Sequence, residues 1–312
     1  MISIQNLSKY YDTTRAVENI SFDIRKGEIL GLLGPNGAGK TTTLRILTCY
    51  LKPTSGTVRI KDLDIIQKPL EVKRLIGYLP ESAPLYPDML VFDYLHYIAS
   101  IRGLRGQARL GRINELATLC GIREVMHRSI GELSKGYKQR VGLAHSMMGD
   151  PEILVLDEPT SGLDPNQIAE IRSIIREIGR EKTVILSTHI LSEAEATCDR
   201  IVIINQGQIV ADGAPETLRS SAGDDTVIRI SLKGVEPGEV ESHLTPLPGV
   251  IRISTASSGE LPIAGQEQTV RVFCERDMRE EIYRRIRETD WSIMEFLLEK
   301  KSLEHIFREL TL

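Results

Sequence analysis

Residues 34–42 read "GPNGAGKTT", and this stretch limits the possible folds of the chain more than any other. An apolar run at 28–34, "EILGLLG", leads into it, and a helical pattern at 40–51, "KTTTLRILTCYL", begins within it. The stretch matches GxxxxGK[ST] in the strand–loop–helix setting that a phosphate-binding loop requires. We therefore expect an α/β protein with this loop at one end of a sheet strand.

The residue types of the loop suit the phosphates of ATP. Bare glycines let the backbone approach phosphate oxygens, and successive N–H groups point inward at a helix N-terminus. Lys40 adds a cation for the β- and γ-phosphates, with a catalytic role, and Thr41 offers its hydroxyl to Mg²⁺. A glycine-rich turn that binds nothing is the simpler alternative, and the complete setting disfavours it. The predicted ATP-binding residues here are Gly34, Pro35, Asn36, Gly37, Ala38, Gly39, Lys40, Thr41 and Thr42.

Two adjacent acids follow a second apolar run, "ILVLDEP" at 153–159. Asp157 is suited to the Mg²⁺ shell, as the matching aspartate of P-loop ATPases is. Glu158 is then free to orient and polarise a water for attack on the γ-phosphate, which makes it the predicted catalytic carboxylate. A solvated acidic surface is the alternative for a lone Asp-Glu pair, and the complete phosphate loop disfavours it.

A second short glycine-containing turn, "LSKGYKQR" at 133–140, also precedes a helical pattern. With it, residues 1–220 resemble the ATP-binding subunit of ABC transporters, with all motifs in that family's order. The resemblance implies that this signature loop completes the site of a second subunit, with Ser134 and Gly136 contacting the partner's γ-phosphate. The chain then works as a head-to-tail dimer, with a copy of itself or with a paralogous ATPase.

Other positions match the family one by one. Tyr11 stands where an aromatic ring would stack on adenine, with Tyr10 as its competitor and an ordinary strand aromatic as the alternative. "SGLD" at 161–164 matches the loop through which the subunits sense each other. His189 matches the switch histidine that contacts the γ-phosphate, and its role is inferred as catalytic. Glu81 stands where the family usually has a glutamine that links Mg²⁺ and water to the membrane partner.

Two departures from the family pattern bear on function. Lys135 and Tyr137 replace the third and fifth residues of the common LSGGQ signature. Glu81 can still be a metal ligand, but it adds negative charge near the γ-phosphate. With these departures the chain resembles one subset of the family, the ATPases of ABC-2-type exporters. The motifs "IGYLPE", "LSKGYKQRVGLA" and "LDEPTSGLDPNQ" together look most like the ATP-binding protein associated with gliding motility and, to a lesser degree, those of copper-enzyme maturation.

The resemblance implies a P-loop NTPase core with a RecA-like mixed sheet over residues 1–220, an antiparallel β subdomain and a helical insert at about 85–148. Short apolar runs between helical patterns predict sheet strands at 28–34, 152–159 and 183–189, and a hairpin at 200–213 turning at Asn205–Gln208. Residues 225–312 predict a separate accessory α+β domain. Its β-α-β-β-α-β order over 226–298 fits a ferredoxin-like sandwich, followed by a helix from Ser302.

Net charge, hydropathy and cysteine spacing limit the partners and the cellular location that we expect. The net charge of −4 and a pI near 6.0 predict no bulk attraction to nucleic acid, so no nucleic-acid partner is expected. No run of 18 apolar residues occurs, and the four cysteines lack metal-ligand spacing. On these properties we expect a cytoplasmic protein, and the resemblance implies that separate transmembrane permease subunits hold it peripherally on the inner face of the cell membrane.

Five of the 15 aromatic residues lie close to Glu81 in the sequence: Tyr78, Tyr86, Phe92, Tyr94 and Tyr97. We interpret the segment around Tyr86 as the groove for a membrane subunit, against the alternative of a small core under the insert. A different class of protein, an ABC ATPase acting on nucleic acid or ribosomes, is disfavoured because residues 43–132 contain no heptad array and the chain has one ATPase unit. A nucleotide-binding regulator without turnover is disfavoured by Glu158.

Overall fold

The structure is a computed structural model that describes residues 1–220, 226–236, 238–255 and 268–299. The described residues form two compact units, divided after Pro215. The predicted helix from Ser302 lies outside the described residues. Each unit has its own hydrophobic core, so each is described by itself.

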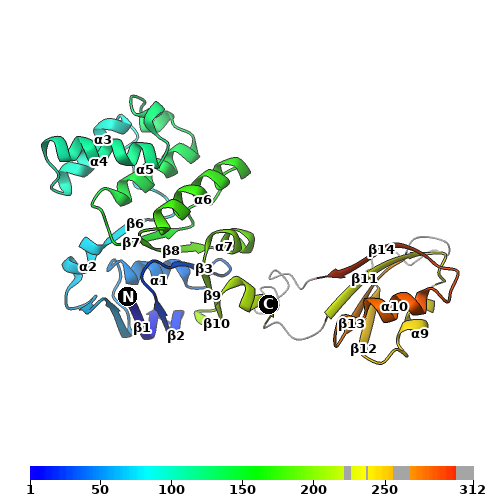
Figure 1. Cartoon of the computed structure of the whole chain (residues 1–312). Helices are drawn as coiled ribbons and strands as arrows, with labels where there is room; N and C mark the ends of the chain where they lie inside the picture. The colour runs from blue at the N-terminus through cyan, green and yellow to red at the C-terminus, as the bar shows by residue number, and fades with distance from the viewer. Residues whose placement is uncertain (221–225, 237, 256–267, 300–312) are drawn as a thin grey trace. The chain divides into compact units, whose positions relative to one another are not determined.

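The first unit is built around a six-stranded sheet in the order β10-β9-β3-β8-β7-β6 (Figure 1). All neighbours in it are parallel except the β9–β10 hairpin, which turns at Gln206 and Gly207, both with positive φ. Strands β3, β7 and β8 are buried along their whole length, as expected for a parallel sheet covered on both faces. The strands are β3 (Ile29–Leu33), β6 (Ile76–Leu79), β7 (Ile153–Asp157), β8 (Thr183–Thr188), β9 (Arg200–Asn205) and β10 (Gln208–Gly213).

A smaller antiparallel sheet lies against the phosphate-loop helix, α1 (Lys40–Leu47). Its strand order is β2-β1-β4-β5, and apolar residues of β1 and β2 share one core with those of α1 and β3. The strands are β1 (Ile2–Tyr11), β2 (Thr14–Ile24), β4 (Ser55–Ile60) and β5 (Leu63–Asp64). The predicted antiparallel subdomain is therefore confirmed.

A helical insert is joined to the edge strand β6, and Figure 1 shows its helices grouped beyond that edge. It contains α3 (Val91–Ile101), α4 (Gly106–Leu119), α5 (Lys135–Met147) and two short turns, Arg123–Val125 and Ile130–Glu132. Helix α5 packs closely on β6, because a Cβ at Gly142 would lie 2.7 Å from Leu79 Cδ1. The signature helix and the segment that leads to Glu81 are thus in direct contact.

The remaining helices of the first unit connect sheet strands or precede them. Helix α6 begins with Asp164 as N-cap, whose side chain accepts from the N–H groups of Asn166 and Gln167, and with Pro165 at its first position. These helices are α2 (Pro69–Leu75), α6 (Pro165–Gly179) and α7 (Leu191–Thr197). Helix α8 (Pro215–Ser220) follows β10.

The second unit is a four-stranded antiparallel sheet in the order β12-β13-β11-β14. Apolar residues of the strands pack against α9 and α10, forming a core that includes Ile228, Val272, Val240 and Ile282. The elements follow the predicted β-α-β-β-α-β order: β11 (Thr226–Lys233), α9 (Glu239–Leu244), β12 (Val250–Thr255), β13 (Gln268–Cys274), α10 (Arg279–Ile286) and β14 (Ser292–Glu299).

The fold class predicted from the sequence is confirmed, with one difference that concerns the site. The strand expected over 152–159 ends at Asp157, before Glu158. Glu158 has a φ of 48°, a left-handed conformation that a strand does not tolerate. The chain therefore turns sharply at this carboxylate and not after it.

Candidate functional site

The phosphate loop follows β3 and needs bare backbone at two positions. A Cβ at Gly34 would lie 2.2 Å from the carbonyl oxygen of Ile204. Gly39 has a φ of 110°, and a Cβ there would lie 2.4 Å from the carbonyl oxygen of Ala16. The backbones of β9 and β2 thus pack directly against the loop at these two glycines, and the opposite side of the loop is left for a ligand.

Lys40 opens α1 and is almost fully buried, with 5% of its surface exposed. Its Nζ donates to the carbonyl oxygens of Gly34 at 2.8 Å and Pro35 at 3.2 Å. It also lies 3.3 Å from Oε1 of Glu158. The ammonium is therefore fixed over the loop, where a phosphate would meet it.

Thr41 and Asp157 lie together, although they come from different strand ends. The Thr41 hydroxyl donates to Oδ1 of Asp157 at 3.0 Å, and the Ser187 hydroxyl donates to the same oxygen at 2.7 Å. Hydroxyl and carboxylate oxygens are ligands that Mg²⁺ prefers, so Thr41 and Asp157 fit a Mg²⁺ ion bound together with nucleotide phosphates.

Glu158 lies at the tip of β7 with 8% of its surface exposed. Its N–H donates to Ser187 Oγ at 2.9 Å, and His189 Nδ1 lies 2.8 Å from its Oε2. Since an ionised carboxylate only accepts, His189 is the donor in this bond. Each oxygen of the Glu158 carboxylate thus has a partner: Lys40 forms an ion pair with Oε1, and His189 donates a hydrogen bond to Oε2.

One cavity of about 230 Å³ collects most of these groups; Asp157 is not among its lining residues but is hydrogen-bonded to Thr41, which is. Besides the loop residues 36–42, its lining includes Glu81, Glu158 and His189, three positions that are far apart in the sequence. Ala16 and Ser161 also line it, and the Ser187 hydroxyl donates to the Asp157 carboxylate and accepts from the backbone N–H of Glu158. Ser161 belongs to the "SGLD" loop predicted from the sequence, whereas Ala16 and Ser187 were not predicted as site residues. Ser187 could have been predicted as a site residue because it lies at the end of a buried strand, two residues before His189.

Tyr11 does not line this cavity. It lies at the end of β1 with 43% of its surface exposed, and Lys9 Nζ lies 5.3 Å from the centre of its ring. Tyr10 is 36% exposed. The structure leaves the Tyr11 ring accessible, and adenine stacking there stays a prediction.

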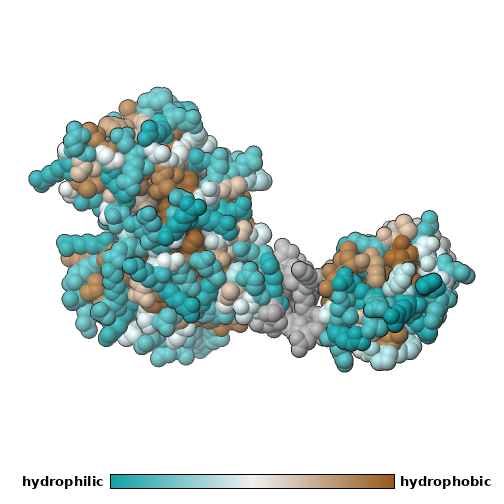
Figure 2. Space-filling model, in the orientation of Figure 1, coloured by the Kyte–Doolittle hydropathy of each residue, from teal (hydrophilic) through white to brown (hydrophobic). Residues whose placement is uncertain are grey.

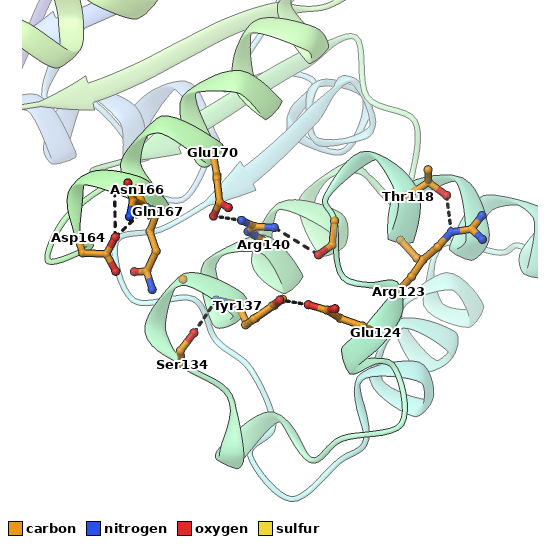
Figure 3. A pocket seen from close by; sticks show the side chains of 13 residues that line it. Thr118, Arg123, Glu124, Ser134, Tyr137, Arg140, Asp164, Asn166, Gln167 and Glu170 are labelled. Atoms are coloured by element: carbon orange, nitrogen blue, oxygen red, sulfur yellow. Dashed lines mark hydrogen bonds and ion pairs between the residues drawn. The ribbon is translucent and has the colours of Figure 1, made fainter.

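Ser134 and Gly136 line a different cavity of about 650 Å³, shown in Figure 3. Ser134 is the N-cap of α5, with its Oγ accepting from the N–H of Tyr137 at 3.4 Å. Gly136 packs on Gln167 of α6, since a Cβ there would lie 2.8 Å from Gln167 Cδ. The signature loop is therefore held between the insert and α6, and none of its residues lines the phosphate-loop cavity.

The two substituted signature residues face different neighbours. The Tyr137 hydroxyl donates a hydrogen bond to Glu124 (Figure 3). The Arg140 guanidinium lies over the Tyr137 ring and forms an ion pair with Glu170. The Lys135 side chain lies across Gly162, where a Cβ would come 2.4 Å from its Nζ. Lys135 thus joins the signature turn to the "SGLD" loop.

The aromatic segment divides between core and surface. Tyr94 is 1% exposed and its hydroxyl lies 2.6 Å from His145 Nδ1, so it belongs to the core of the insert. Tyr86, Phe92 and Tyr97 are 49%, 39% and 44% exposed. Figure 2 shows hydrophobic residues among the polar ones on the surface of the insert. The exposed rings are the part of the segment still available to a partner.

Sequence comparisons agree with this geometry. A sequence model described as ABC transporter matches residues 17–161. An ABC transporter ATP-binding protein of Bacillus subtilis, YxlF, is 39% identical over 241 residues, covering 77% of this chain and 80% of the relative. Nod factor export ATP-binding protein I of Burkholderia pseudomallei is 33% identical over 315 residues, covering 99% of this chain and 96% of the relative.

Solved structures with the same fold include two ATP-binding cassettes. The dimeric post-hydrolysis state of MJ0796 bound to ADP and Pi has a TM-score of 0.63 and 25% identity, covering 69% of this chain and 98% of that one. CbiO1 of Clostridium perfringens, part of the transporter complex cbiONQ, has a TM-score of 0.66 and 27% identity, covering 70% of this chain and 90% of that one.

Proposed function

Since this chain belongs to the ABC transporter family and is an ATP-binding, ATP-hydrolysing subunit of it, we propose that it powers export through separate transmembrane permease subunits. In this proposal two ATPase subunits close around two ATP molecules and reopen after hydrolysis. Closing and reopening move the permease subunits.

One observation supports the dimer: the chain carries two half-sites that share no residue. Lys40 and Glu158 line one cavity, and Ser134 and Gly136 line the other. A two-fold axis would bring the signature loop of each subunit to the phosphate loop of the other and complete both sites at once. The related MJ0796 cassette has a dimeric structure bound to ADP and Pi. The partner is a second copy of this chain or a paralogue.

The geometry gives each residue of the site a part in hydrolysis. The loop N–H groups and Lys40 would hold the β- and γ-phosphates, and Thr41 with Asp157 would hold Mg²⁺, which neutralises phosphate charge. Glu158 would orient the attacking water, with His189 fixing its carboxylate and contacting the γ-phosphate. Glu81, exposed at the cavity rim, would act as a further metal ligand and link the site to the insert.

The exposed rings of the insert are the proposed contact with the permease. Tyr86 packs edge-on against the buried Tyr94, with ring centres 5.9 Å apart, so it is held in place while half of its surface stays accessible. None of the helices in the described part of the chain combines the length and apolar character needed to cross a bilayer. Because it would act through permease subunits, we propose a cytoplasmic position for the chain, peripheral on the inner face of the membrane.

The direction of transport is proposed from the relatives. Their names include Nod factor export and, for YbhF of Escherichia coli at 35% identity, probable multidrug ABC transporter. Export by an ABC-2-type system is consistent with these names. The closer resemblance to the gliding-motility protein stays a prediction. For the second unit we propose that it stabilises the dimer or regulates turnover.

A pull-down of the tagged full-length chain from gently solubilised native membranes tests the proposal. The expected result is recovery of a polytopic membrane protein, identified by mass spectrometry. Recovery of only ribosomal or DNA-bound proteins would contradict the transport role and favour a cytosolic ABC ATPase. ATP turnover would be measured on the same preparation, so that failure of the partner assignment is not confused with inactive protein.

A further inference from the structure

Glu158 is held in a conformation that it would not adopt by itself. Its φ of 48° is in the left-handed region, which is unfavourable for a residue with a Cβ. Such a conformation persists only where neighbouring groups enforce it. The residues next to Glu158 should therefore carry specific restraints on both sides.

On the N-terminal side, Ser187 supplies the restraint. Its hydroxyl donates to Asp157 Oδ1 at 2.7 Å and accepts from the N–H of Glu158 at 2.9 Å. Ser187 is fully buried in β8, the strand next to β7. The end of β7 is thus fastened to the end of β8 before the turn begins.

On the C-terminal side of Glu158, the restraint comes from Glu193 of α7. Oε2 of Glu193 accepts from the hydroxyl of Thr160 at 2.5 Å and from the hydroxyl of Thr188 at 3.2 Å. Thr160 follows Glu158 by two residues, and Thr188 comes immediately before His189. One carboxylate oxygen therefore joins the loop that carries Glu158 to the loop that carries His189.

The second oxygen of Glu193 argues against a purely structural role. Oε1 is buried and has no hydrogen-bond partner among the described residues. A half-satisfied buried carboxylate destabilises a fold compared with an apolar or neutral residue of similar shape. Fold stability alone would therefore not favour an acid at position 193. An acid there is favoured if it restrains the loops that carry Glu158 and His189.

We propose that Glu193 is a positioning residue that fixes Glu158 and His189 relative to each other for ATP hydrolysis. This inference rests on the proposed function, in which Glu158 orients the attacking water. Without Glu193 the Thr160 and Thr188 hydroxyls lose their shared acceptor, and the turn at Glu158 is restrained on one side only. Within the residues that the structure describes, no hydrogen bond or ion pair joins Glu193 to the phosphate loop or to Lys40, so ATP binding should be preserved.

The test measures kcat and KM for ATP turnover, the Kd for ATP and the thermal midpoint of the full-length chain. Glu193→Ala should lower kcat about 10- to 100-fold, as expected when a reacting group is displaced, with KM and Kd changed less than about twofold. Glu193→Gln keeps a carbonyl acceptor for both hydroxyls and should retain most of kcat. Ser192→Ala, an exposed neighbour on the same helix, is the control and should match the wild type.

Thr160→Val tests the contact itself, because it removes the hydroxyl and keeps the side-chain shape. It should lower kcat, and combining it with Glu193→Ala should add little, because both changes break one link. A wild-type kcat for Glu193→Ala, or equal losses in kcat and ATP affinity, would overturn the proposal. Glu158→Gln is measured in parallel: if it keeps full turnover, the catalytic role of Glu158 fails, and if it is inactive while Glu193→Ala is active, only this inference fails.

Discussion

His189 donates a hydrogen bond from Nδ1 to Oε2 of Glu158 over 2.8 Å, and the two residues lie at the ends of adjacent parallel strands. Lys40 is 3.3 Å from the other oxygen of the same carboxylate. Glu158, His189 and Lys40 are therefore in direct contact within one cavity.

Replacing Glu158 by glutamine should abolish most turnover while ATP still binds. The amide keeps the shape and a hydrogen-bond acceptor but cannot polarise water as a carboxylate does, so kcat should fall about 10²- to 10⁴-fold. Steady-state phosphate release gives kcat, and equilibrium binding of ATP gives Kd. Glu177→Gln, at an exposed position on α6, is the matched control. Turnover within a few-fold of wild type would contradict the assigned role.

Replacing Glu81 by glutamine should change the metal dependence of turnover. Glu81 lines the phosphate-loop cavity, so its carboxylate would add a negative charge beside a γ-phosphate bound as proposed. Affinity for a hard cation depends on the number of charged oxygens, so half-maximal activity should need about three- to tenfold more Mg²⁺. The Mg²⁺ and pH profiles of ATP turnover are compared with those of Glu71→Gln, an exposed control. Unchanged profiles would remove Glu81 from the metal site.

Replacing Tyr86 by alanine should weaken association with the permease and spare nucleotide binding. Truncating a half-exposed aromatic anchor at an interface commonly costs about 1–2 kcal/mol, or roughly a tenfold loss of affinity. Tyr283→Ala is the matched control, because Tyr283 is also 49% exposed but lies in the second unit. Recovery of the membrane partner in pull-downs and the Kd for ATP are the two readouts. Intact recovery of the partner would exclude Tyr86 from the contact.

Deleting residues 221–312 should leave a folded first unit with altered dimerisation or basal turnover. The first unit has its own core of apolar residues from both of its sheets, so removal of the second unit should not unfold it. Circular dichroism checks the fold, light scattering with ATP measures the dimer, and phosphate release measures turnover. If dimerisation and turnover both match those of the full chain, the second unit has another role.

Protonation of His145 should lower the free energy of unfolding in mild acid. Burial lowers the pKa of its imidazole below the usual 6.5, and the Arg102 guanidinium lowers it further. Below pH 6.5 the unfolded chain therefore binds the proton more readily than the folded chain, and the free energy of unfolding falls as pH decreases through this window. His145→Asn keeps an acceptor for the Tyr94 hydroxyl without a titrating group.

The measurement is denaturant unfolding at pH 7 and pH 5. The wild type should lose more of its free energy of unfolding between these pH values than His145→Asn does. His127→Asn, a change at an exposed histidine, should behave like the wild type. An equal loss in wild type and His145→Asn would show that another group causes the acid sensitivity.

Contiguous motifs were predictable from the sequence because their chemistry is local. In "GPNGAGKTT" the strand, the loop and the first helical turn follow one another, so the backbone geometry at Gly39 and the position of Lys40 depend mostly on neighbours in the chain. The order of strands and helices was predictable for a similar reason, since hydrophobic periodicity is set by the residues of each element.

Contacts between strand ends depended on the tertiary structure. Ser187 and Glu193 restrain Glu158 because β7 and β8 are neighbours in register, and that pairing joins residues about 30 positions apart. No local pattern encodes such a register, and the left-handed turn at Glu158 follows from it. The sequence by itself thus determined which groups are predicted to bind phosphate and which acid is predicted to act on water. Only the packing of non-consecutive strands decided how that acid is held, and that the signature loop lines a separate cavity.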